Sequence, residues 1–138
     1  MQILLLYCLI ACTIALKGQD VQLKSFKVTA VTFGITTPMS ISCSEFESSF
    51  PSKNYSVQNF SDSVHIVQLI RALSRVELAK KDSLHINVRA KVYLEYGSPH
   101  TERILCIDKF YNIELDGRRI KRNRTLINYL KLLLKSSE

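Results

Sequence analysis

The chain has 138 residues, of which 46% are hydrophobic and 22% are charged, and its formal net charge is +7. These values are typical of one globular domain and exclude a disordered or low-complexity protein. A domain of this size buries roughly two thirds of the surface of its unfolded chain, so its folding requires neither a metal nor a disulfide framework.

The N-terminus predicts export. Residues 1–16 are largely apolar, and the first charged side chain is Lys17. This run is short for a membrane-spanning helix, which needs about 20 residues, and it fits the apolar core of a secretory signal. We therefore expect an export signal segment at residues 1–15 and a single α+β domain at residues 16–138. The alternative is a buried N-terminal strand or helix.

Two processing schemes fit this segment. Thr13 and Ala15 supply the small residues of a cleavage site, which would give a free mature protein beginning near Leu16. The tetrapeptide that ends at Cys12 resembles a bacterial lipobox, in which the cysteine is acylated. The expected location is therefore outside the cytoplasm: secreted, periplasmic or lipid-anchored to the cell envelope.

Export leaves two cysteines in the folded domain, Cys43 and Cys106. In an oxidising compartment they are candidates for one disulfide. The alternative is a pair of free thiols that pack as small apolar groups. The sequence leaves both options open.

Apolar residues that alternate with polar residues predict six strands. The clearest is Leu84–Tyr96, where the alternation continues for thirteen residues and predicts one buried and one polar face. A segment rich in Ser and Asn, 47–61, is interrupted by Pro51 and is expected to form a loop. The predicted strands cover residues 21–33, 39–44, 84–96, 103–108, 111–115 and 118–122.

Helical spacing of apolar residues predicts two helices. The first has a candidate N-cap at Ser61, Asp62 or Ser63 and is expected to end near Lys80. The second has a candidate N-cap at Asn123 or Thr125 and runs through Lys135. The element order is therefore ββαββββα, which predicts an α+β fold with an antiparallel sheet backed by two helices.

The last helix carries an unusually wide apolar stripe. The stripe predicts either deep docking against the sheet, which is the favoured interpretation, or contact with a partner or a membrane surface. The residues of the stripe are Leu126, Ile127, Leu130, Leu133 and Leu134, with Tyr129 and Leu132 outside it.

The net charge is concentrated at the C-terminus. Residues 19–117 contain equal numbers of basic and acidic side chains, whereas residues 118–138 contain seven Lys or Arg and one acid. Such a cluster can bind phosphate, sulfate or an acidic protein surface, or it can protect a sheet edge from pairing with other chains. Export and the lack of interleaved aromatic residues argue against nucleic acid. The basic residues of the predicted hairpin are Arg118, Arg119, Lys121, Arg122 and Arg124.

Three Asn-x-Ser/Thr triplets begin at Asn54, Asn59 and Asn123. In a secreted eukaryotic chain they would be acceptors for N-linked glycans on loops. In a bacterial chain they would be turns and caps, and the lipobox interpretation of Cys12 would gain weight.

Catalytic signatures are weak. The three histidines, His65, His85 and His100, lack the spacing of a zinc site. Neither a nucleophile elbow nor a glycine-rich dinucleotide or phosphate loop is present. Cys106 with His85 or His100 could form a cysteine nucleophile, but Cys106 lies in an apolar run where a thiol is usually inert. We expect neither an enzyme nor a bound metal or cofactor.

The sequence therefore predicts an exported, non-enzymatic binding module that recognises a protein partner, in the manner of an inhibitor or immunity protein. Its expected binding residues are the basic hairpin together with Arg89, Lys91 and Tyr93 on the polar face of the long strand. The first alternative is a binder of anionic polymer or lipid headgroups that uses the basic 118–124 hairpin. The second alternative is a Cys-dependent enzyme.

Overall fold

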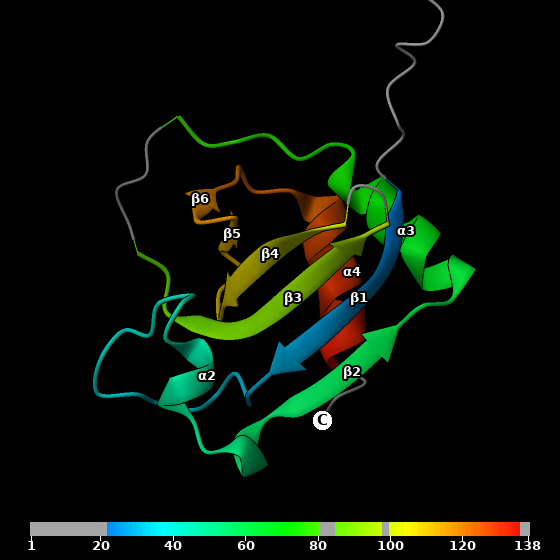
Figure 1. The fold of residues 1–138 in the computed structure, drawn as a ribbon. Helices are drawn as coiled ribbons and strands as arrows, with labels where there is room; N and C mark the ends of the chain where they lie inside the picture. Colours follow the sequence, from blue (N-terminus) through cyan, green and yellow to red (C-terminus); the bar gives the residue numbers. More distant parts are fainter. Residues whose placement is uncertain (1–21, 81–84, 98–99, 136–138) are drawn as a thin grey trace, which may run out of the picture.

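The computed structural model describes residues 22–80, 85–97 and 100–135; the predicted export segment with Cys12 lies outside them. One antiparallel sheet has the strand order β2-β1-β3-β4-β5-β6, and the helices α3 and α4 pack against one of its faces (Figure 1). The strands are β1 (Leu23–Ala30), β2 (Ser56–Phe60), β3 (Val88–Tyr96), β4 (Thr101–Asp108), β5 (Ile113–Leu115) and β6 (Arg118–Arg119), and the helices are α2 (Phe46–Ser49), η1 (Ser52–Asn54), α3 (Ser63–Leu73) and α4 (Arg124–Lys135). The α+β class and the order ββαββββα are confirmed.

The main core lies between the sheet and the two longer helices. Alternate residues of β1 and β3, such as Phe26 and Val92, face α4, whose whole predicted apolar stripe is buried. Leu132 lies outside the stripe and is 68% exposed. Tyr129 is buried as well, and its hydroxyl donates a hydrogen bond to the backbone oxygen of His65 in α3. The docked interpretation of the last helix is therefore confirmed.

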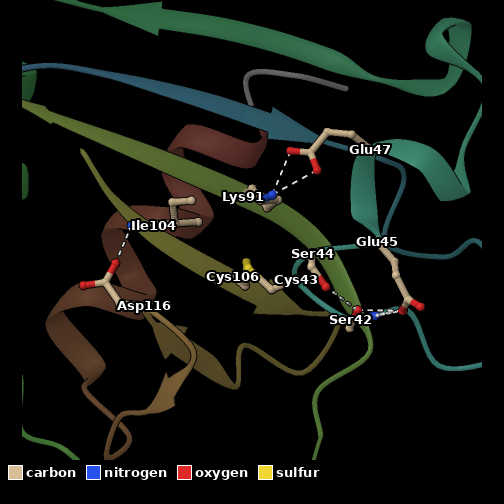
Figure 2. Close-up of a disulfide and its surroundings, with 9 residues drawn as sticks. All are labelled: Ser42, Cys43, Ser44, Glu45, Glu47, Lys91, Ile104, Cys106 and Asp116. Atoms are coloured by element: carbon tan, nitrogen blue, oxygen red, sulfur yellow. Dashed lines mark hydrogen bonds and ion pairs between the residues drawn. A yellow bond between two sulfur atoms is a disulfide. The ribbon is translucent and has the colours of Figure 1, made fainter. Parts of the chain in front are cut away.

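A second, smaller core covers one end of the opposite face of the sheet. Residues 31–55, between β1 and β2, pass over this face and include α2 (Figure 1). We call this segment the excursion. Phe46, Phe50 and Tyr55 of this excursion pack edge to face with one another. A disulfide between Cys43 and Cys106 joins the excursion to β4 (Figure 2).

The predicted strand at 39–44 is wrong, because these residues lie within the excursion and form no strand. Ile41 is buried in the smaller core, and its oxygen accepts a hydrogen bond from the nitrogen of Val88 without extending the ladder of the sheet. The second strand is instead β2, which lies inside the segment expected to be a loop. Three later strands are shorter than predicted. β3 begins at Val88, β5 begins at Ile113 and β6 ends at Arg119.

Both helix N-caps were among the predicted candidates. The carboxylate of Asp62 accepts a hydrogen bond from the nitrogen of His65, and the side-chain oxygen of Asn123 accepts one from the nitrogen of Leu126. The predicted end of the first helix near Lys80 is wrong, because α3 ends at Leu73 and the chain continues in irregular structure.

Candidate functional site

The basic hairpin begins with a tight turn between β5 and β6. Asp116 and Gly117 have φ angles of 50° and 76°, which is the left-handed pair that a type I′ turn requires and that the sequence Asp-Gly favours. The turn sets the register in which Leu115 faces Arg118 and Glu114 faces Arg119. The short strand β6 is thereby fixed at the edge of the sheet.

Residues 75–80 lie along the outer side of this hairpin. The nitrogen of Ala79 donates to the oxygen of Arg119 at 2.9 Å, and the nitrogen of Lys121 donates to the oxygen of Glu77 at 2.8 Å. The side-chain amide of Asn123 also donates to the oxygen of Arg75 at 3.1 Å. Two segments that are about 40 residues apart in the sequence therefore lie side by side at this edge of the sheet.

We call this region the basic surface. It contains the five basic residues predicted from the sequence and two that the sequence analysis missed, and all except the half-buried Arg119 are exposed. Its basic residues are Arg75, Lys80, Arg118, Arg119, Lys121, Arg122 and Arg124.

Two further side chains modify the charge and polarity of the basic surface. Glu77 forms an ion pair with Lys121, and the hydrogen bond and charge of that lysine hold the pKa of Glu77 below its usual value. Leu78 lies next to Glu77 and remains 39% exposed. The basic surface therefore combines the exposed positive charge of Arg118, Arg122 and Arg124 with one partly exposed apolar side chain on the neighbouring segment.

Arginine suits this position chemically. The planar guanidinium group presents several N–H donors in a fixed fork that matches carboxylate, sulfate and phosphate groups. Hydrogen bonds at the neighbouring residues Arg119, Lys121 and Asn123 hold this stretch of backbone, so less conformational freedom is lost on binding. The basic surface can therefore bind carboxylate-rich or sulfated partners.

The long strand does not present the exposed polar face that we expected. Arg89 and Lys91 are only 2% and 5% exposed, so the expectation is wrong for these two residues. Burial lowers the pKa of Arg89, although the charge of Asp108 opposes this effect. The guanidinium of Arg89 donates to the oxygens of Val88 and Ile35, which holds the excursion against β3.

Tyr93 keeps an accessible position on the same face. Its ring lies beneath Lys27, whose Nζ is 4.2 Å from the ring centroid, and Lys91 lies 5.1 Å from it. Lys91 also forms an ion pair with Glu47 of α2 (Figure 2). Tyr93 lines a cavity of about 230 Å³ with Lys27, Phe60, Glu95 and others, and this cavity is separate from the basic surface.

The two cysteines of the domain are bonded to each other, with their Cα atoms 5.8 Å apart. A disulfide of this kind is typical of proteins that fold in an oxidising, extracytoplasmic compartment. The sulfur of Cys106 carries no thiolate in this form, and thiolate is the nucleophilic species of cysteine. His85 is exposed and lines a cavity of about 240 Å³ beside Cys43, while His100 lies on the surface near Glu95.

A larger cavity of about 620 Å³ lies where β1 and α4 end and β2 begins. Aromatic side chains from three segments line it, namely Phe33, Tyr55 and Tyr111, with Lys53 and Lys135 at its margin. No sequence signal could have located this cavity, because its walls come from segments far apart in the chain.

Within the described ranges, no three His, Cys, Asp or Glu side chains lie close enough to hold a metal ion. Among the helices of those ranges, none has the length and apolar character needed to cross a membrane. No protein-family model, no curated protein and no solved structure matches the chain.

Proposed function

We propose that this chain is an exported, non-enzymatic binding module, closed by a disulfide, that recognises an acidic protein surface through its basic surface. One observation carries the proposal: residues 75–80 and 118–124 are hydrogen-bonded to each other at one edge of the sheet, and these two segments together carry seven basic residues. A preformed surface of this kind favours rapid, oriented association with a partner of opposite charge.

A protein partner fits the composition of the basic surface better than a uniform polyanion. Leu78, which bridges to Ile120 of the hairpin, adds a partly exposed apolar side chain, and Glu77 pairs with Lys121 within the same region. Protein interfaces are enriched in arginine and combine it with apolar contacts. A site for a polyanion gains nothing from an internal carboxylate.

The proposal includes export through residues 1–15. It has two forms, a released protein that begins near Leu16 and a protein anchored through an acylated Cys12. The intact mass of the mature protein from its native host separates them, because acylation adds the mass of fatty acyl chains to a chain that begins at residue 12.

The binding proposal is tested by comparing wild-type protein with the triple variant Arg118→Ser/Arg122→Ser/Arg124→Ser. Each is immobilised, exposed to the extracellular fraction of the native host, cross-linked and analysed by mass spectrometry. We expect a protein that the wild type retains and the variant loses.

The matched control is Lys24→Ser/Lys53→Ser/Lys109→Ser, which removes the same charge from exposed positions elsewhere. This control should retain the partner. Equal capture by all three proteins, or capture of no protein by the wild type, contradicts the proposal. The anionic-polymer alternative predicts a different result. The wild type would then stay on a heparin column to high salt, the arginine variant would not, and no protein would be captured.

A further inference from the structure

The two edges of the sheet are protected unequally. At the β6 edge, residues 77–79 hydrogen-bond along the outer side of the hairpin, and exposed arginines flank it. At the other edge, β2 pairs with β1 and is the terminal strand of the sheet. Exposed strand edges are sites of association between chains unless charge, proline, a bulge or a cover protects them.

The strand β2 carries none of the usual protecting residues. Its five residues, Ser56–Phe60, include neither a charged side chain nor a proline. Val57 lies near its centre and is 56% exposed. The exposed edge is therefore uncharged and partly apolar, which predicts self-association if nothing covers it.

Two of the three Asn-x-Ser/Thr triplets lie at this edge, one just before β2 and one that begins within it. Asn54 ends η1, two residues before β2 begins, and Asn59 lies within β2 opposite Lys27. Both asparagines are exposed. Within the described ranges, neither side-chain amide is engaged in a hydrogen bond, so this part of the chain leaves both amides available for a substituent.

We propose that Asn54 and Asn59 carry N-linked oligosaccharides and that these glycans cover the β2 edge. In the modification, the Nδ2 atom of each asparagine loses a proton and forms a bond to the anomeric carbon of an oligosaccharide. The sugar's bond to its lipid-diphosphate carrier breaks, and the lipid diphosphate leaves. The proposal depends on export of the chain through a compartment that supplies this donor, and it does not depend on the basic surface.

The third triplet differs in its structural role. The side-chain oxygen of Asn123 caps α4, and its Nδ2 atom donates to the oxygen of Arg75 at 3.1 Å. A sugar on this nitrogen would be crowded against the segment at 75–80 that completes the basic surface. Asn123 therefore remains unmodified in the proposal, and the β6 edge stays open to a partner while the β2 edge is covered.

The sites are tested on the mature protein purified from its native host. Peptide N-glycosidase releases N-linked glycans and converts each modified asparagine to aspartate, which peptide mass spectrometry then locates. We expect aspartate at positions 54 and 59 and an unchanged Asn123. The absence of a glycan at either of the first two sites, or a glycan at Asn123, overturns the proposal.

Variants expressed in the same host give an independent reading. Asn54→Gln and Asn59→Gln should each remove the mass of one glycan, whereas the matched control Asn123→Gln should remove none. If either of the first two variants keeps the wild-type mass apart from the substitution, the assignment of that site is wrong.

The protective role is tested by native deglycosylation followed by sedimentation at rising protein concentration. We expect the glycosylated protein to stay monomeric and the deglycosylated protein to associate. Val57→Lys should prevent this association by charging the β2 edge, whereas the control Val64→Lys, on the exposed side of α3, should not. A deglycosylated protein that remains monomeric at every concentration overturns the protective role.

Discussion

Reduction of the disulfide between Cys43 and Cys106 should weaken the fold without removing any packed side chain. The bond closes a loop of 63 residues that contains α2, β2, α3 and β3. Its main effect is on the unfolded chain, because an open chain of this length gains conformations that the closed chain lacks.

The magnitude follows from the loop length. The chain-entropy relation for a separation of 63 residues gives a stabilisation of roughly 4 kcal/mol at 25 °C. A domain of about 120 residues loses on the order of 4 °C in melting temperature for each kcal/mol. Reduction should therefore lower the melting temperature by roughly 15 °C.

Urea unfolding followed by circular dichroism measures this effect directly. The free energy of unfolding should fall in the reduced protein. Its decrease with urea concentration should be steeper, because the unfolded chain without the disulfide exposes more surface. The control is the variant Cys43→Ala/Cys106→Ala, whose unfolding should not respond to reductant. If oxidised and reduced wild-type protein unfold with free energies that agree within about 1 kcal/mol, the loop-entropy reasoning is refuted.

Three further predictions concern α3 and α4. Burial raises the pKa of Tyr129 to about 12, so its neutral form stabilises the fold fully below pH 10, and this contribution is lost as pH rises from 10 through 12. The loss is roughly 3 kcal/mol in chemical unfolding, and Tyr129→Phe should remove it while costing about 1 kcal/mol at neutral pH through the lost hydrogen bond to His65. Asp62→Ala should cost about 1 kcal/mol by removing the N-cap of α3. Leu130→Ala should cost about 2–5 kcal/mol because the side chain is fully buried, whereas Leu132→Ala should cost almost nothing.

Each prediction has a contrary outcome. An unchanged fall in stability above pH 10 in Tyr129→Phe would show that other tyrosines control it, since burial raises the pKa of Tyr55 and Tyr96 as well. Wild-type stability in Asp62→Ala would mean that the cap is dispensable. Equal losses for Leu130→Ala and Leu132→Ala would contradict the packing of α4.

Elements with a strong repeating pattern were predictable. The alternation across Leu84–Tyr96 located β3, and the stripe after Asn123 located α4 with its correct last residue. In both elements the pattern reflects contact with one large core, so local sequence and tertiary packing agree.

The strand β2 could not be predicted in the same way. Ser56–Phe60 is an edge strand in which Val57 and Asn59 are exposed and the other residues are only half-buried. Its apolar content is therefore low, and the segment resembles a loop. Residues 39–44 showed the opposite error, because Met39 is exposed and the alternation there does not correspond to a strand.

The site was predictable only where its residues are contiguous in sequence. The hairpin at 118–124 carries its own charge signal, but Arg75 and Lys80 join it only because α3 stops at Leu73 and the following residues turn along β6. Burial of Arg89 and Lys91 depends on the excursion that covers them. These placements are set by tertiary contacts, which periodicity does not encode.

The strand order determines when the fold can close as the chain is made. β1 lies in the sheet between β2 and β3, so one of its neighbours is synthesised some 60 residues after it. α4, whose six buried side chains complete the main core, is the last described element. A growing chain therefore lacks the α4 side of its main core until α4 has been made, although α3 can already pack against β1. Such late, long-range pairing is slow and leaves apolar surface open to association, so loss of the final helix should prevent folding altogether.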